Sequence, residues 1–201
     1  EKPLTTRERG GLGWFSVVPG TPGGAVAARS LVYWLRDRRY LVNTLVIPVA
    51  AVATVVPLLI AGVPANVAAL VPILFVALFF GWLPHNDLAY DSTAIWMHVA
   101  SGLRGLPDRV GRLVPILVIA IPVLAIGIPI SVALHGRWAI APAIVGVCAS
   151  LFFSGLGLSS IASAASPYPV TPPGESPFQQ PQRTGPSGVL SQSLVMLGSI
   201  G

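Results

Sequence analysis

The chain has 201 residues, of which 9% are charged and 53% are hydrophobic, and its mean hydropathy is +0.75. Soluble domains carry about 25% charged residues, so this composition excludes a water-soluble globular protein. The formal net charge is +5, and in a membrane protein such an excess of basic residues reflects topology rather than nucleic-acid binding.

The N-terminal region is expected to be a cytoplasmic tail followed by a helix on the membrane surface. Residues 1–24 combine charge with Gly and Pro, which is typical of a cytoplasmic tail or linker. Residues 25–40 (AVAARSLVYWLRDRRY) place Ala28 and Leu31 on one helical face and Arg29 on the other. This pattern predicts an amphipathic interfacial helix before the first span.

Long uncharged segments predict the membrane spans. No charged residue occurs in the 47 positions 40–86, the 24 positions 113–136 or the 37 positions 138–174. A transmembrane helix needs about 20 mostly apolar residues, so these segments hold two, one and one spans. The expected fold is an all-α, polytopic transmembrane helical bundle over residues 25–201. Its spans are 41–60, 67–83, 113–134 and 138–162, and its other segments are a polar segment at 85–112, a Pro-rich loop at 166–188 and the start of a fifth span at 189–201.

The distribution of basic residues predicts the orientation. Eleven Lys and Arg residues lie on one side of the predicted spans, and only Arg137 lies on the other. The positive-inside rule therefore places the N-terminal side, segment 85–112 and the Pro-rich loop in the cytoplasm.

The third and fourth spans carry two further patterns. Pro115, Pro122 and Pro129 are seven residues apart, which predicts a kinked third helix that faces protein, and these prolines either only pack or also move during transport. The small, hydroxyl-rich run 154–166 predicts close helix packing. Cys148 has no partner cysteine and is interpreted as a buried packing thiol.

Segment 85–112 carries the densest polar chemistry. Asp91 before Ser92 and Thr93 is an N-cap signal, and Ile95 and Val99 then recur at helical spacing. The pattern predicts a short amphipathic helix outside the bilayer with Trp96 at its centre. Such a helix either docks in a groove of another protein or lies on the membrane surface.

A group of titratable residues near the membrane border allows a different interpretation. His85, Asp87, Asp91 and His98 could form a metal or acid–base site, which would make the chain a membrane-embedded enzyme acting on lipids. No zinc-binding spacing occurs, so capping or salt bridges to neighbouring arginines are favoured. A structural membrane subunit that transports nothing is a third possibility.

Two absences from the sequence limit the transport mechanisms that the chain could use. They contain no Asp, Glu, Lys or Arg, which argues against a carrier driven by an ion gradient. The sequence contains no GxxxxGK[ST] phosphate loop, so any nucleotide hydrolysis belongs to another chain or segment.

Three stretches resemble a known family. AARSLVYWLRDRRYLV, NDLAYDSTAIWMHVASGLRGLPDRVGR and PYPVTPPGESPF resemble membrane subunits of bacterial ABC-2-type ABC transporters, most closely the large permeases of tetronasin-type antibiotic and multidrug exporters. The likeness covers most of residues 22–190, and NDLAYDSTAIWMH is its most specific part.

The resemblance implies a function and a set of partners. It implies a permease without catalytic, cofactor or metal sites of its own in the bacterial cytoplasmic membrane. A separate ATPase subunit in two copies would hold ATP and Mg, and a lipophilic antibiotic, drug or lipid-like cargo would leave the cell. Such permeases have two six-span halves in one chain, so we expect this sequence to be part of one half.

The resemblance also implies roles for particular residues. The stretch from Asp91 to Arg104 would be the coupling helix, and the helix before the first span would be the connecting helix beside the ATPase. The residues expected at the ATPase contact are Asp87, Asp91, Trp96, His98 and Arg104, and those of the connecting helix are Arg29, Arg36, Arg38 and Arg39.

Overall fold

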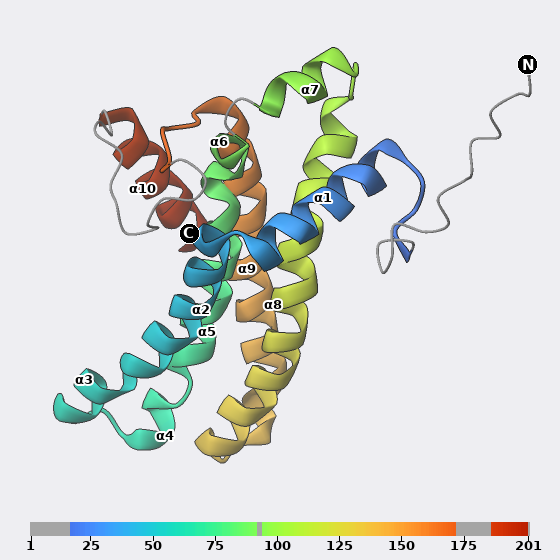
Figure 1. Ribbon diagram of the computed structural model, residues 1–201. Helices are drawn as coiled ribbons and strands as arrows, with labels where there is room; N and C mark the ends of the chain where they lie inside the picture. The colour runs from blue at the N-terminus through green and yellow to red at the C-terminus, as the bar shows by residue number, and fades with distance from the viewer. Residues whose placement is uncertain (1–16, 92–93, 172–185, 201) are drawn as a thin grey trace, which may run out of the picture.

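The computed structural model (Figure 1) describes residues 17–91, 94–171 and 186–200, and within these ranges the chain is helical and has no strand. Four helical segments are long and apolar enough to cross a membrane. The expectation of an all-helical chain with four membrane-length helices is confirmed. These candidate spanning segments, called spanning segments below, are Arg38–Ile60, Ala65–Tyr90, Gly105–His135 and Trp138–Ala165.

Several shorter elements make up these segments. The helices are α1 (Pro22–Arg36), α2 (Arg38–Ala53), α3 (Val55–Ile60), α4 (Ala65–Ala68), α5 (Val71–Trp82), α6 (Asp87–Tyr90), α7 (Ile95–Ala100), α8 (Gly105–His135), α9 (Ala141–Ala165) and α10 (Pro186–Ile200), with 3-10 turns η2 (Leu83–Asn86) and η4 (Trp138–Ile140). Most of the tail expected over 1–24 and of the loop expected over 166–188 lies outside the described residues.

The helix expected over residues 25–40 is split at Asp37. Helix α1 begins at Pro22, because the Thr21 hydroxyl caps it by accepting a hydrogen bond from the Gly24 amide. The backbone of Asp37 is extended, and its carboxylate accepts the Arg39 amide as the N-cap of α2. The interfacial helix therefore ends at Arg36, and the last residues of the predicted helix belong to α2.

The spanning segments form two hairpins (Figure 1). Gly62, with a φ of 83°, lies in the turn between α3 and α4, and Gly136, with a φ of 84°, ends α8. Glycine suits both positions because other residues rarely adopt positive φ. Helix α8 begins eight residues before the expected start of the third span at 113, so it also contains Asp108, Arg109 and Arg112.

Close packing between small residues holds the bundle together. Helix α9 packs along α5, and α1 crosses α8. Gly155, Ser159 and Ser163 of α9 are buried, and the Ser159 hydroxyl donates to the Gly81 carbonyl over 2.9 Å. The close packing predicted for residues 154–166 is confirmed, as is the burial of the Cys148 thiol.

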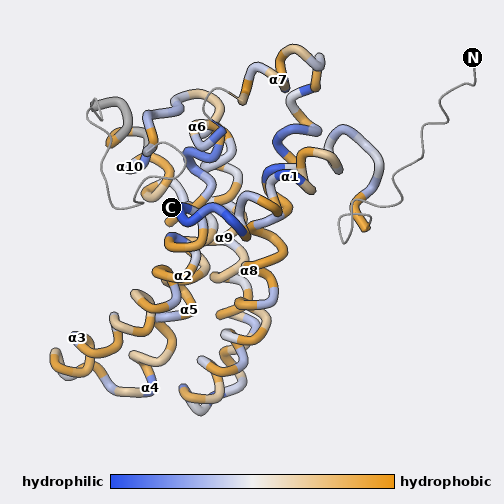
Figure 2. Tube along the Cα trace, in the orientation of Figure 1, coloured by the Kyte–Doolittle hydropathy of each residue, from blue (hydrophilic) through white to orange (hydrophobic). Residues whose placement is uncertain are grey.

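Most of the apolar surface of the spans faces outward. Only 11 to 39% of the most apolar window of each spanning segment is buried within the chain, so a bilayer or another protein must cover the remainder. Figure 2 shows the hydrophobic colour along these helices, whereas the hydrophilic colour gathers around α6 and at the junction of α1 and α2. We call this hydrophilic region, with α6 and α7, the charged end of the bundle.

The three prolines of the third span do not share one environment. Helix α8 continues through all of them. Pro115 is buried, but Pro122 and Pro129 are both exposed. The expectation that all three face protein is therefore wrong for Pro122 and Pro129, because no neighbouring helix of the described chain covers the face of α8 on which they lie.

Helix α10 covers most of residues 189–201, where the start of a fifth span was expected, and it lies at the charged end. It packs against α9, with Val195 and Ser199 buried. Its Leu190, Leu194 and Leu197 are 62 to 69% exposed.

Candidate functional site: a buried ionic cluster beside an exposed helix

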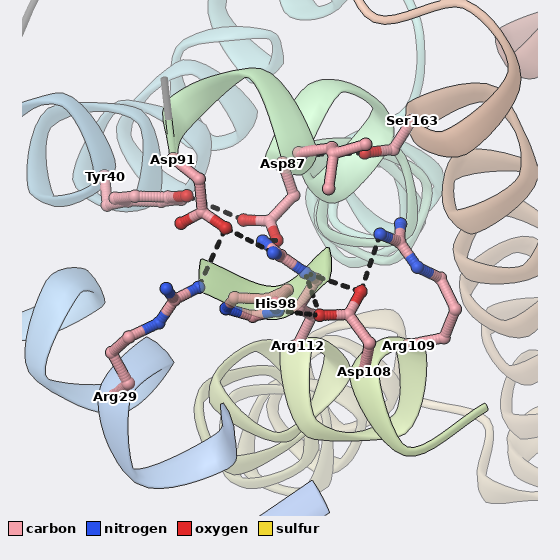
Figure 3. Close-up of polar contacts among 10 residues, drawn as sticks. Arg29, Tyr40, Asp87, Asp91, His98, Asp108, Arg109, Arg112 and Ser163 are labelled. Carbon is pink, nitrogen blue, oxygen red and sulfur yellow. Dashed lines mark hydrogen bonds and ion pairs between the residues drawn. The ribbon is translucent and has the colours of Figure 1, made fainter. Parts of the chain in front are cut away.

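Ionic side chains from several helices meet at the charged end (Figure 3). We call this group the Arg112 cluster. It joins α1, α2, α6, α7 and α8, and its members are Arg29, Tyr40, Asp87, Asp91, His98, Asp108, Arg109 and Arg112.

Arg112 lies at the centre and contacts three carboxylates. Its side chain is only 4% exposed. The Nε atom lies 3.0 Å from Asp108 Oδ2, Nη1 lies 3.2 Å from Asp87 Oδ2, and Nη2 bonds to Asp91 Oδ2. The planar guanidinium, with its five N–H donors, can satisfy all three carboxylates at once.

The outer members tie neighbouring helices to this centre. Arg29 of α1 donates to Asp91 over 2.8 Å, and the Tyr40 hydroxyl of α2 donates to Asp87 over 2.6 Å. His98 Nδ1 lies 2.7 Å from Asp108 Oδ1, and Arg109 pairs with the same carboxylate. The three aspartates and the three arginines balance in charge, which stabilises buried ions that would otherwise be costly.

The structure brings together some of the predicted site residues and adds others. Asp87, Asp91 and His98 all belong to the cluster, in keeping with the favoured salt-bridge interpretation. Arg112 and Asp108 were not among the predicted residues. Their four-residue spacing in a helix was the available signal, since such pairs lie on one face.

Helix α7 differs from its predicted form. It begins at Ile95 with Ala94 at the N-cap position, and residues 92–93, on which the expected start after Asp91 falls, lie outside the described residues. The Asp91 carboxylate instead bonds to Arg29 and Arg112. The helix ends at Ala100, before Gly102, whose φ is 66°, and it is therefore shorter than the predicted stretch from Asp91 to Arg104.

The exposed side chains of α7 are its apolar ones. Trp96 is 64% exposed and Val99 is 77% exposed, whereas His98 points inward to Asp108 (Figure 3). An exposed tryptophan on a helix outside the spanning segments is typical of a surface that a partner protein or the membrane–water interface covers.

A groove lies between α1 and α7. Its volume is about 730 Å³, and Arg29, Met97, Leu103, Arg104 and Pro107 are among the residues that line it. Arg104, predicted at the ATPase contact, is an exposed residue that precedes α8. The groove thus combines apolar walls with two arginines.

The four arginines predicted for the connecting helix lie in different environments. Arg29 belongs to the Arg112 cluster, and Arg36 and Arg38 are exposed. Arg39 is buried, pairs with Asp37 over 2.5 Å and donates to the Thr171 carbonyl over 2.6 Å. Arg39 thus fixes the junction of α1 and α2 to the segment that follows α9.

His85 lies apart from the carboxylates with which the sequence grouped it. Its Nδ1 bonds to the Trp82 carbonyl over 2.9 Å, and its Nε2 bonds to the Tyr168 hydroxyl. In the described part of the chain, no hydrogen bond links His85 to Asp87 or Asp91. Over the same residues, no group of three or more His, Cys, Asp or Glu side chains could hold a metal ion.

No protein-family model, curated protein or solved structure matches the chain. The functional inference therefore rests on the residues of the chain and their geometry.

Proposed function

We propose that this chain is part of the permease of an ATP-driven, ABC-2-type exporter in the bacterial cytoplasmic membrane. A separate ATPase subunit in two copies would bind and hydrolyse Mg–ATP, and the permease would move a lipophilic antibiotic, drug or lipid-like molecule out of the cell. The resemblance of NDLAYDSTAIWMH to such permeases supports this proposal, as do four helices of membrane length. The basic charged end would lie in the cytoplasm.

The observation that carries the proposal is the orientation of α7. Trp96 and Val99 face outward, while His98 on the same helix is anchored to Asp108. Large apolar side chains exposed in water are energetically unfavourable until a partner buries them. Tryptophan is also enriched among residues that dominate binding energy at protein interfaces.

The Arg112 cluster offers a physical route from this surface to the spans. A displacement of α7 would pull on Asp108 through His98, and Arg112 connects Asp108 to Asp87 of the preceding spanning segment and to Asp91 directly after it. Asp87 in turn accepts a hydrogen bond from the hydroxyl of Tyr40, which lies near the start of α2. Charge-assisted hydrogen bonds of this kind are strong and directional, so helices joined in this way would move together.

Co-purification tests the proposal. The full-length protein is extracted in mild detergent from its native membrane, and bound proteins are identified by mass spectrometry and assayed for ATP hydrolysis. The matched variants are Trp96→Ala and Trp138→Ala, since Trp138 is 60% exposed and lies at the opposite end of the bundle. We expect an ATPase to co-purify with the wild type, about tenfold less with Trp96→Ala, and undiminished with Trp138→Ala. A protein that carries no ATPase, or equal retention by both variants, would overturn the proposal.

A further inference from the structure

A second cavity lies between α2 and α5 near the charged end, with a volume of about 320 Å³. We call it the ladder pocket, because five aromatic rings that line it follow one another from α5 to the segment after α9, in stacked pairs except for Phe79 and Trp82, which meet edge to face. The ring-centroid distances are 4.2 Å for Phe75–Phe79, 6.0 Å for Phe79–Trp82, 3.9 Å for Trp82–His85 and 5.8 Å for His85–Tyr168.

The opposite wall gives the pocket a polar end and an apolar end. Asn43 and Ala50 of α2 both line it, and a helix rises about 10 Å over seven residues. Asn43 lies toward the charged end with His85 and Tyr168, whereas Ala50 lies toward the apolar part of the bundle with Phe75. The pocket therefore suits an amphiphile that lies parallel to the spans, with its polar end toward the charged end of the bundle.

Hydrogen bonds fix the rings at the polar end. A carbonyl can only accept, so His85 donates Nδ1–H to the Trp82 carbonyl, and its Nε2 accepts a hydrogen bond from the Tyr168 hydroxyl. The Tyr168 oxygen also accepts from Gln192 of α10 over 2.6 Å. Burial raises the pKa of Tyr168 to about 12, so the hydroxyl stays neutral and able to donate at physiological pH. A ligand would therefore meet a preformed surface.

The charges around the pocket favour an uncharged ligand. Among the described residues that line it, none is a carboxylate that would neutralise a cation. The ring of Tyr90, another lining residue, lies 4.9 Å from the Arg39 guanidinium, whose charge is paired with Asp37 and so does not call for an anion. Val46, on the wall formed by α2, is 51% exposed, so the pocket opens on the outer surface of two spanning segments, where a molecule dissolved in a bilayer could enter.

We propose that the ladder pocket binds an uncharged, flat aromatic amphiphile that enters from the membrane with its polar group toward Asn43 and His85. This inference rests on the proposed function and deepens it, because it names the chemistry of the cargo and its first contact. Aromatic stacking along Phe79 and its neighbours would supply the binding energy.

The test uses N-phenyl-1-naphthylamine, an uncharged aromatic amphiphile, with the full-length protein in lipid nanodiscs. Binding is measured as saturable energy transfer from tryptophan to the probe. The variants are Phe79→Ala, which removes one ring, and Ala50→Phe, which fills the pocket. The control is Phe153→Ala, because Phe153 of α9 is 58% exposed and lies outside the pocket. Circular dichroism and elution volume verify that each variant folds.

We expect saturable binding by the wild type and by Phe153→Ala, weakened about tenfold by Phe79→Ala and abolished by Ala50→Phe. The absence of saturable binding by the folded wild type would overturn the inference, as would an equal loss in Phe153→Ala. Displacement of the probe by a phospholipid with brominated chains would also overturn it by identifying a lipid site.

The two proposals can fail separately in these experiments. The binding measurement needs no ATPase, and Trp96→Ala leaves the pocket intact. Probe binding without any co-purifying ATPase would therefore refute the exporter alone, and an ATPase without saturable probe binding would refute the ladder pocket alone.

Discussion

Gly81 of α5 and Gly155 of α9 face each other where the two helices pack, so closely that a Cβ added to Gly155 would lie 3.2 Å from the Cα of Gly81. The contact lies just before η2 and α6, which carry His85 and Asp87. About two turns beyond Gly155, the Ser163 hydroxyl of α9 accepts a hydrogen bond from the Leu88 amide. Close packing of small residues therefore positions the segment that supplies carboxylates to the Arg112 cluster.

Replacing Gly81 by alanine should destabilise the bundle. The new Cβ would lie 2.5 Å from the Phe152 carbonyl oxygen, and this backbone atom cannot rotate away. We expect a loss of about 1–3 kcal/mol in the free energy of unfolding, measured by denaturant titration in detergent. Gly146→Ala is the control, since nothing lies within 4 Å of a Cβ at that helical position. Equal stability of the two variants would contradict the close contact.

Replacing Arg112 should destabilise the protein more than replacing any other arginine of the cluster or of the surface. Arg112→Gln leaves three buried carboxylates without their common partner, which should cost about 3–5 kcal/mol. Arg137→Gln, an exposed position at the other end of the bundle, should leave the melting temperature unchanged. Adding Asp91→Asn to Arg112→Gln should restore part of the loss, because one unpaired charge disappears. A double variant no more stable than Arg112→Gln would show that these residues do not interact.

The link between α7 and α8 predicts a change in protease sensitivity. His98→Ala removes the hydrogen bond to Asp108, and trypsin can cleave after the exposed Arg104 that separates the two helices. We expect cleavage there to accelerate about tenfold, in line with the loss of one charge-assisted hydrogen bond. His135→Ala, which removes a bond to the Asn66 carbonyl at the opposite end, is the control. Mass spectrometry identifies the site, and an unchanged rate in His98→Ala would show that the bond does not hold α7.

Hydropathy was sufficient to predict the four membrane-length helices, because the solvent that surrounds such helices determines their composition. Boundaries set by side-chain capping were harder to predict. Asp37 and Asp91 both precede helical patterns, and aspartate caps helices or pairs with arginine equally well. Only the tertiary structure decides, since Arg39 lies two residues after Asp37 whereas Arg112 reaches Asp91 from another helix.

The Arg112 cluster and the ladder pocket depend on contacts between distant residues. Tyr40 and Asp87 are 47 residues apart, and His85 and Tyr168 are 83 apart. No local periodicity encodes such contacts. The outward direction of Trp96 and Val99 also depends on the anchoring of His98, because a helix of six residues is too short for its apolar pattern to fix which side faces the protein.

The cap between α1 and α2 should give stability a measurable dependence on acid. Burial by itself would raise the pKa of Asp37, but hydrogen bonds from the side chain and backbone of Arg39 outweigh it and hold the pKa below the ordinary value of 3.8. Since the folded pKa is the lower one, the carboxylate stabilises the fold fully above pH 3.8, and this contribution is lost as the pH falls through the folded pKa. Asp37→Asn should therefore melt below the wild type near neutral pH, and the difference should shrink in acid. Thr21→Ala removes the uncharged cap of α1, so its effect on the melting temperature should not vary with pH. A difference between wild type and Asp37→Asn that stays constant from about pH 7 to about pH 3 would show that the Asp37 carboxylate does not supply this stability.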